Sequence, residues 1–382
     1  MPDAYFPYGV VRAPGEPPRP AIRVGAGAAA LAALELDVAP AVLEAPDLNP
    51  LLALGAAGWA DLHEQVAAAV RAGRHERASL PLSELETLLP IAAGDYVDFY
   101  ASLSHATNVG RIFRPGAEPL LPNWRHLPVG YHGRAGTVVV SGTAVRRPCG
   151  QLSPAEPGGA PAFGPEPRLD LELELGWVTG DGPPRGELID AGRAGDHIFG
   201  LVLVNDWSAR AIQRWEYQPL GPFLGKSFAT SISAWIVPYA AFAGARVPGP
   251  VQEPAPLPHL RVHEPRALDI DLAIELNEVV ISRSNARHLY WSPEQMLAHA
   301  TTNGATVRAG DLFASGTVSG PEPGSYGSLL EVSWDGRDPI DVGGESRTFL
   351  QDGDTVVLRG RAGSGVELGE VAGTVQPVRA AR

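Results

Sequence analysis

Residues 198–206 read Ile198-Phe199-Gly200-Leu201-Val202-Leu203-Val204-Asn205-Asp206, with no polar side chain before Asn205. A strand with one wet face alternates apolar and polar residues, so this unbroken run predicts a strand buried on both faces. The domain is therefore expected to form around a covered sheet. Asp206 ends the run, and a carboxylate at the end of a buried strand is costly unless it is paired or binds a metal.

Other strand patterns surround this run. Residues 136–140 are rich in valine, residues 169–175 and 268–276 alternate, and residues 341–375 alternate short runs with turn pairs such as Asp352-Gly353. The 44 glycines and 37 prolines, which follow no repeat, favour many turns. Helical signals are few, the clearest being a capping box at Ser292 and Gln295. The sequence predicts a β-dominated (α+β) fold with long loops, where sites are usually built.

The chain divides near residue 90. Residues 1–90 carry short strand candidates at 9–11 and 21–24 among prolines, followed by apolar residues at helical spacing from Trp59 to Val70. No candidate site residues stand out there. Strand signals dominate residues 91–382, so we expect a small N-terminal domain over 1–90 and a large C-terminal domain over 91–382.

Composition excludes several classes of protein. The net charge is −13 and no basic stripe is visible, which argues against nucleic acid as a partner. The single cysteine, Cys149, fits a reducing compartment. The N-terminus lacks a signal-peptide pattern, and the apolar run over residues 28–34 is too short to span a bilayer. We therefore expect a cytoplasmic protein without a membrane partner.

Acidic residues form the sharpest local pattern. In Asp170-Leu171-Glu172-Leu173-Glu174, strand geometry places the three carboxylates on one face and the leucines on the other. Alone, this pattern is more typical of a solvent-exposed face. Together with Asp206, however, clustered carboxylates without a nearby histidine or cysteine predict a hard-cation site for Ca²⁺ or Mg²⁺ rather than zinc.

A second segment, residues 98–105, offers Asp98, Tyr100 and His105 close together. His105 is a candidate general base and Asp98 a candidate fourth oxygen ligand. The residues alone leave His126, His132 and His197 as rival histidines. Glu331 stands inside an apolar run, which by itself indicates an outward-facing position in a strand.

A third segment runs from Asn205 to Thr230 and contains Lys226, the one lysine among 30 basic residues. Lysine is a compact point charge, whereas arginine is broad and planar, so its retention favours a narrow pocket. The density of different polar groups among prolines and glycines predicts a rigid loop that lines this pocket. A fourth segment, residues 314–320, consists of small residues whose backbone can approach a ligand closely.

The chain resembles the fumarylacetoacetate hydrolase family. The resemblance rests on Asp98-Phe99-Tyr100 and on longer motifs that span residues 105–110, 121–124, 127–134, 205–210 and 219–228. It covers nearly the whole chain and is weakest before Ile91. It implies a small N-terminal SH3-like β-barrel domain, a large C-terminal mixed β-sandwich roll, and a homodimer that contacts mainly through the C-terminal domain.

The resemblance also implies site residues. Ca²⁺ is expected on Asp98, Glu172, Glu174 and Asp206, and Mg²⁺ on Asp206, Thr230 and the backbone carbonyl of Lys226. Relatives carry aspartate at Ala211 and glycine at Ala229, and the second difference lies beside Thr230 of the expected Mg²⁺ site. His105 is expected to activate water, oriented by Glu331, with Arg210, Gln213 and Lys226 stabilising negative charge. Substrate contacts are expected from Tyr100, Arg114, Tyr131, Gln213, Tyr217 and Thr317.

The activity implied by the resemblance is hydrolysis of the carbon–carbon bond of 4-fumarylacetoacetate to fumarate and acetoacetate, the last step of tyrosine and phenylalanine catabolism. A related acylpyruvate or diketo-acid hydrolase is the alternative within the superfamily. A non-catalytic β module stabilised by Ca²⁺ is the alternative from another class, but it gives no reason for His105, Arg210, Gln213 and Lys226 together.

Overall fold

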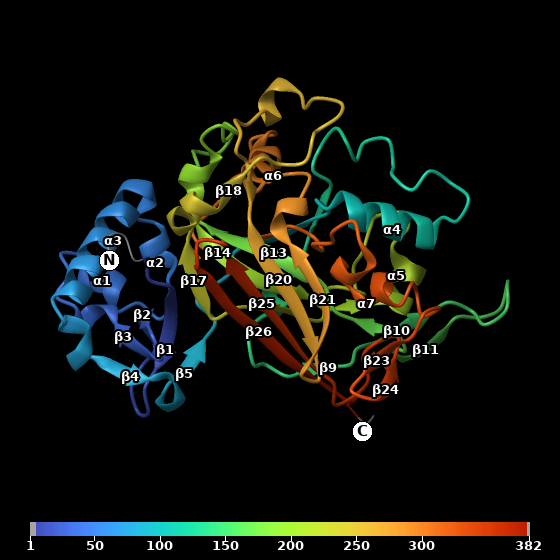
Figure 1. The fold of residues 1–382 in the computed structure, drawn as a ribbon, viewed down its shortest axis with the longest axis horizontal. Coiled ribbons are helices and arrows are strands. Elements are labelled where there is room, and N and C mark those ends of the chain that lie inside the picture. Colours follow the sequence, from blue (N-terminus) through green and yellow to red (C-terminus); the bar gives the residue numbers. More distant parts are fainter. Residues whose placement is uncertain (1–4, 380–382) are drawn as a thin grey trace.

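The computed structural model describes residues 5–379. Two large sheets dominate it (Figure 1). The larger is mixed, and its main path runs β4 (Ser79–Pro81), β3 (Gly27–Ala30), β2 (Arg19–Val24), β1 (Tyr8–Arg12), β17 (Trp235–Pro238), β14 (Ile198–Asp206), β13 (Leu173–Thr179), β22 (Leu312–Ala314), β6 (Tyr96–Phe99) and β7 (Gly130–His132). Beside this path, β5 (Glu86–Leu88) pairs with β1, and β16 (Thr230–Ile232) pairs with β14 and β8 (Val138–Val140).

The second sheet has the order β21 (Val279–Asn285), β20 (Ile270–Leu276), β25 (Thr355–Ala362), β26 (Glu367–Gln376) and β9 (Val145–Arg146). Short two-stranded ribbons flank the sheets: β10 (Cys149–Leu152) with β11 (Ala162–Pro165), β12 (Leu169–Asp170) with β15 (Ser208–Ala209), β18 (Arg246–Val247) with β19 (Ala267–Leu268), and β23 (Ile340–Val342) with β24 (Glu345–Arg347). The predicted β-dominated fold is confirmed.

The helices are short, apart from α3. The N-terminal segment contains α1 (Pro40–Leu43), α2 (Asn49–Leu52) and α3 (Gly55–Arg71), and the rest of the chain contains α4 (Leu103–Phe113), α5 (Arg210–Glu216), α6 (Pro293–Thr301) and α7 (Leu329–Val332). The predicted capping box is present at the start of α6, where the Ser292 and Gln295 side chains bond to each other's backbone N–H groups. Among the described helices, none has the length and apolar character needed to cross a membrane.

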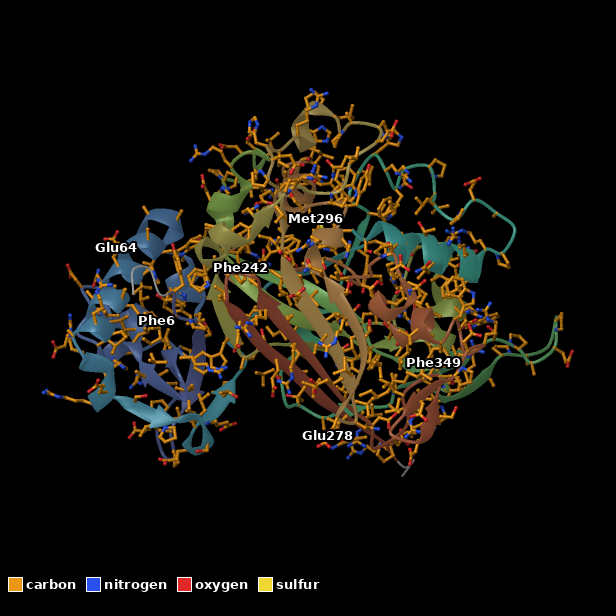
Figure 2. All side chains as sticks on the ribbon, in the orientation of Figure 1. Phe6, Glu64, Phe242, Glu278, Met296 and Phe349 are labelled. Atoms are coloured by element: carbon orange, nitrogen blue, oxygen red, sulfur yellow. The ribbon has the colours of Figure 1, made fainter. Side chains whose placement is uncertain are left out.

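Strand β14 is buried at every position, as its unbroken apolar sequence predicts. Leu201 and Leu203 join a core cluster with residues of β20 and β25, including Leu272 and Leu358. Phe242 and Met296 of the same cluster are labelled in Figure 2. Val202 and Val204 point to the opposite face and join a second cluster with residues of the N-terminal segment. Strand β14 therefore lies between the two core clusters, and this packing on both faces fixes the position of Asp206 at its end.

Among the described residues, the expected N-terminal β-barrel does not close. Strands β1 to β4 form the edge of the large sheet, because Tyr8 and Gly9 of β1 pair with Ile236 and Trp235 of β17. No pairing joins β4 to β5 among the described residues, so the ring stays open. The edge of β1 is already covered because it pairs with β17 of the large sheet. Its backbone groups therefore do not depend on a closed barrel for hydrogen-bond partners. The division at residue 90 stays a prediction.

The alternating segment 169–175 also differs from one continuous strand. Asp170 ends β12 and Glu174 lies in β13, with Leu171 and Glu172 between the two strands. All three carboxylates are buried, so the solvent-exposed interpretation is wrong.

Candidate active site

Four carboxylates meet at one end of neighbouring strands in the large sheet. Asp98 lies in β6, Glu174 in β13 and Asp206 at the end of β14, while Glu172 directly precedes β13. These strands are neighbours in the order β14, β13, β22, β6, which brings residues far apart in sequence to one place. One ligand atom from each of the four lies within 4.8 Å of the others, and all four side chains are buried.

The cluster is electrostatically unbalanced. Burial, reinforced by repulsion from Asp206, raises the pKa of Asp98 well above its usual range. Burial and the charges of Asp98, Glu172 and Asp206 do the same to the pKa of Glu174. Both carboxylate oxygens of Glu174 lack a hydrogen-bond partner among the described residues. Buried, unpartnered oxygens in an all-oxygen donor set fit a hard divalent cation.

Lys226 lies beside this cluster. Its Nζ is 2.5 Å from Oε2 of Glu172 and 2.8 Å from Oδ2 of Asp206, so it bridges two of the four carboxylates. Burial alone would lower the pKa of Lys226, but Asp206 and Glu172 raise it above its usual value, which keeps the side chain charged. Tyr131 donates to Asp98 at 3.0 Å and to Asp206 at 2.8 Å, and Thr230 donates to Asp206 at 3.1 Å.

His105 and Glu331 contact each other, although 226 positions separate them in the sequence. Nδ1 of His105, in the first turn of α4, lies 2.7 Å from Oε2 of Glu331, and both side chains are buried. Burial would raise the pKa of Glu331, but His105 and the other donors around the carboxylate lower it. An ionised Glu331 that accepts from Nδ1 leaves Nε2 of His105 free to take a proton.

Glu331 corrects one expectation from sequence. It lies in α7, capped by Ser328, and is buried rather than facing outward from a strand. Its carboxylate also accepts from Asn108 at 3.0 Å, Ser319 at 2.8 Å and Ser328 at 3.0 Å. Sequence reasoning missed these three donors. Asn108 stands three residues after His105 on a helix, and that spacing was a usable signal.

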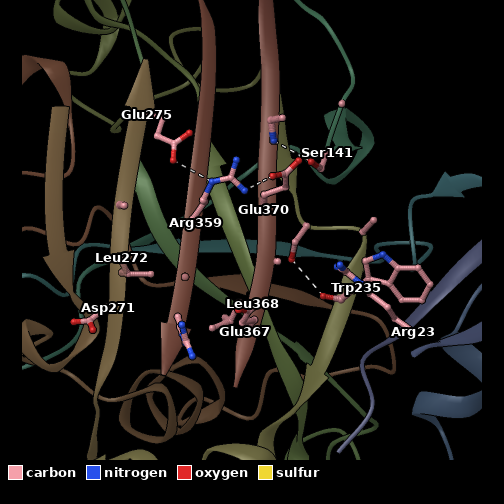
Figure 3. Close-up of a pocket in the computed structure, with 18 of the residues that line it drawn as sticks. Arg23, Ser141, Trp235, Asp271, Leu272, Glu275, Arg359, Glu367, Leu368 and Glu370 are labelled. Carbon is pink, nitrogen blue, oxygen red and sulfur yellow. Dashed lines mark hydrogen bonds and ion pairs between the residues drawn. The ribbon is translucent and has the colours of Figure 1, made fainter. Parts of the chain in front are cut away.

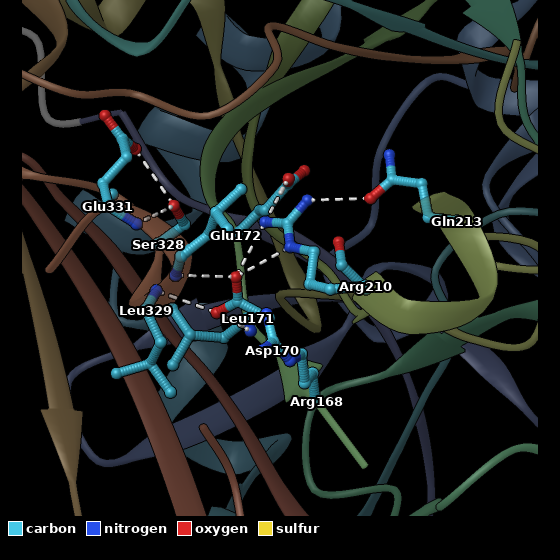
Figure 4. Close-up of polar contacts among 12 residues, drawn as sticks. Arg168, Asp170, Leu171, Glu172, Arg210, Gln213, Ser328, Leu329 and Glu331 are labelled. Carbon is cyan, nitrogen blue, oxygen red and sulfur yellow. Dashed lines mark hydrogen bonds and ion pairs between the residues drawn. The ribbon is translucent and has the colours of Figure 1, made fainter. Parts of the chain in front are cut away.

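Arg210 and Gln213 start helix α5 and lie next to the carboxylates (Figure 4). Nη2 of Arg210 is 2.7 Å from Oε1 of Glu172, and Nη1 donates to Gln213 at 3.1 Å. Glu172 thus contacts both Arg210 and Lys226. These cations, with a smaller contribution from His105, lower the pKa of Glu172 despite its burial. A β-bridge joins Glu172 to Ser328, whose hydroxyl donates to Glu331, so the histidine pair and the carboxylate cluster are neighbours.

The other predicted residues lie around this centre at different depths. The Tyr100 ring meets the His105 ring edge-on at 5.3 Å, and the buried Oγ1 of Thr317 has no hydrogen-bond partner among the described residues. Gly316 has a positive φ, which favours glycine, and a Cβ there would also collide with the Phe99 carbonyl. Arg114 donates to the Pro119 carbonyl at 2.6 Å.

Tyr217, at the end of α5, packs against Phe113 with ring centroids 6.1 Å apart. Among the rival histidines, Nδ1 of His197 contacts the Asp181 carbonyl at 3.0 Å, and neither His126 nor His132 has a contact with Glu331 in the described part of the chain.

Two cavities differ in whether they reach the carboxylate cluster. One, of about 370 Å³, is lined by Tyr131, Asp206 and Lys226 and so opens onto the carboxylate cluster. A larger one, of about 1010 Å³, lies against β20, β25 and β26 and contains none of the four carboxylates. Its central Arg359 is paired with Glu275 and Glu370 (Figure 3). The smaller cavity reaches the cluster from the side of Asp206 and Lys226, and its lining does not include His105, Glu331, Arg210 or Gln213.

Comparison with known proteins shows the family to which the chain belongs. Residues 96–376 match the family profile described as "Fumarylacetoacetate (FAA) hydrolase C-terminal". The fumarylacetoacetases of Rattus norvegicus and Homo sapiens are each 45% identical to this chain, and each alignment covers 97% of this chain and 95% of the relative. A fumarylacetoacetate hydrolase structure from Exiguobacterium antarcticum has a TM-score of 0.59 at 15% identity, covering 98% of this chain and all of that one, so it supports the fold alone. The chain therefore belongs to the fumarylacetoacetate hydrolase family.

Proposed function

We propose that this chain hydrolyses the carbon–carbon bond of 4-fumarylacetoacetate, giving fumarate and acetoacetate, the last step of tyrosine and phenylalanine catabolism. Its relatives named fumarylacetoacetase support the assignment. The observation that carries it is that the His105–Glu331 pair adjoins the buried carboxylate cluster, through the β-bridge of Glu172 with Ser328 and the bond of the Ser328 hydroxyl to Glu331. A module that only binds Ca²⁺ has no use for a buried histidine base.

In the proposed mechanism, Nε2 of His105 removes a proton from water, whose oxygen attacks the carbonyl carbon of the fumaryl group. Glu331 holds the Nδ1 proton and stabilises the imidazolium that forms. The carbon–carbon bond then breaks, its electron pair leaves with the acetoacetate portion as an enolate, and the proton that His105 took from water returns to that product. Arg210, Gln213 and Lys226 donate to the developing negative charge.

A divalent cation would be held by Asp98, Glu172, Glu174 and Asp206, and when bound it supplies Lewis-acid polarisation of the diketone. We propose Ca²⁺ for this site and Mg²⁺ for a second site at Asp206, Thr230 and the Lys226 carbonyl.

Substrate contacts are proposed for Tyr100, Arg114, Tyr131, Gln213, Tyr217 and Thr317. The homodimer and the cytoplasmic location stay predictions, and light scattering at working concentration tests the former.

The proposed activity is tested with the purified, metal-loaded protein. We expect loss of the near-ultraviolet absorbance of the diketone, with fumarate identified as the product. Efficient cleavage of simple acylpyruvates without turnover of 4-fumarylacetoacetate would assign the chain to the smaller hydrolases of the superfamily instead. No turnover of either class, with metal bound, would favour the non-catalytic module.

Replacing Glu174 with Gln should abolish most of the stabilisation that Ca²⁺ gives. Cation binding to the native state adds about 2.7 kcal/mol at a hundredfold excess over Kd, and the variant lacks one ligand. In metal-free buffer the variant should lose little stability, since the raised pKa of Glu174 means that its ionised form opposes folding at neutral pH. Thermal unfolding and calorimetry with and without Ca²⁺ measure both effects.

Glu294→Gln is the matched control, because Glu294 is a buried glutamate bonded to Tyr239 and Arg246 rather than to the cluster. It should keep the wild-type response to Ca²⁺. An unchanged Ca²⁺ affinity in Glu174→Gln would remove Glu174 from the ligand set.

A further inference from the structure

Asp170 is a fully buried carboxylate that the mechanism above does not use. It ends β12, two residues before Glu172, but it is not part of the group of four that gathers within 4.8 Å. Its oxygens bond to Arg210 and to helix α7 (Figure 4). A buried charge is retained only where its partners compensate its desolvation, so the partners of Asp170 indicate its role.

The two oxygens have different sets of donors. Oδ1 accepts from the backbone N–H groups of Leu329 and Leu171, each at 2.8 Å. Oδ2 accepts from the backbone N–H of Leu330 at 3.0 Å and from Nε of Arg210 at 2.8 Å, and Nη2 of Arg210 is also 2.8 Å away. One carboxylate thereby binds a guanidinium and the first turn of a helix at the same time.

The bonds to α7 matter because of what that helix carries. The first N–H groups of a helix have no partner within it. In α7, Asp170 accepts from Leu329 and Leu330, while the Ser328 hydroxyl accepts from Glu331 at 3.4 Å. Glu331 is the third residue of this single turn, so the position of its carboxylate depends on how the turn is held.

The bonds to Arg210 fix the other half of the site. Oδ2 of Asp170 accepts from Nε of Arg210 and lies 2.8 Å from Nη2 as an ion pair, while Nη1 donates to Gln213. Glu172 contacts Nη2 as well, but at a single atom. The two hydrogen bonds from Nε to Asp170 and from Nη1 to Gln213 define the plane of the guanidinium, whereas the bond to Gln213 alone would allow it to rotate.

We propose that Asp170 is a positioning residue, which sets the distance between the His105–Glu331 pair and the Arg210–Gln213 pair. The inference rests on the proposed function for its kinetic consequence. Water activation and stabilisation of the resulting charge must occur on one substrate, so both pairs need a common anchor. Asp170 is the described side chain that bonds both to the turn carrying Glu331 and to Arg210.

The test is Asp170→Asn, which keeps size but replaces one acceptor oxygen with an N–H donor. Whichever oxygen is replaced, the new N–H donor faces other donors, either those of Leu330 and Arg210 or those of Leu329 and Leu171. The hydrogen bonds from that pair of residues to Asp170 are then lost. We expect kcat to fall about a hundredfold, the lower range for losing one electrostatic contribution. KM for 4-fumarylacetoacetate should stay within about threefold, as should the Kd for Ca²⁺ by calorimetry.

A second measurement does not depend on substrate. A proton held between His105 and Glu331 at 2.7 Å should give a low-field ¹H NMR resonance, and Asp170→Asn should shift or broaden it as Glu331 moves. Asp354→Asn is the matched control: Asp354 is buried, pairs with Arg347 and accepts from the Gln351 backbone, and none of its bonds in the described part of the chain reaches His105, Glu331 or Arg210. The control should keep both kcat and the resonance.

The outcomes separate the two proposals. A wild-type protein inactive on 4-fumarylacetoacetate refutes the proposed function, and the resonance then decides the role of Asp170 alone. A wild-type kcat or an unchanged resonance in a folded Asp170→Asn overturns the positioning role. Equal losses in Asp354→Asn would also overturn it, because they would trace the effect to general loosening of the fold.

Discussion

His105→Gln should lower kcat by about three decades, within the ~10²–10⁴ range for loss of a general base. Glutamine has an N–H that can still bond to Glu331, which His105 contacts at 2.7 Å, so the local structure should hold. It has no group that can take a proton from water near neutral pH. The loss should fall on kcat with little change in KM, because proton transfer occurs only on the way to the transition state.

Steady-state kinetics on the metal-loaded variant measure this effect. His126→Gln and His197→Gln are the controls, since they remove histidines that lie outside the contact with Glu331. Both should turn over like the wild type. A His105→Gln variant with wild-type kcat, or a comparable loss in one of the controls, would move the base to another residue.

Lys226→Arg should lower kcat by two to three decades, although it keeps the charge. The ammonium bridges Glu172 and Asp206 in a buried space, and a planar guanidinium is too broad to occupy the same point. A loss of that size corresponds to about 3–4 kcal/mol, the scale for one electrostatic donor to developing charge. If the lysine stabilises the departing enolate, KM should change little.

Kinetics and Ca²⁺ calorimetry on the same preparation separate this effect from damage to the metal site, since we expect Ca²⁺ binding to survive. Arg214→Lys is the reverse exchange on helix α5, at a partly exposed residue paired with Asp335. It should leave turnover unchanged. Wild-type turnover in Lys226→Arg would show that the retention of this one lysine has no functional reason.

Local sequence determined the strands and the types of residue in the site. The unbroken apolar run over residues 198–204 specified a strand buried on both faces, because side-chain periodicity depends only on neighbours along the chain. The same holds for the capping box at Ser292. The acidic residues of the cluster were recognisable because carboxylates next to buried strands need a partner.

The tertiary structure decided which of these residues meet. Glu331 alone predicted an exposed strand position, yet it lies buried in α7 against His105. Asp170 shares the alternation of Glu172 and Glu174, yet it bonds to Arg210 and α7 instead of joining their cluster. The N-terminal strands extend the large sheet rather than close a barrel. Periodicity specifies the face a side chain occupies, whereas the partner on that face depends on strand order and register, which bring distant segments together.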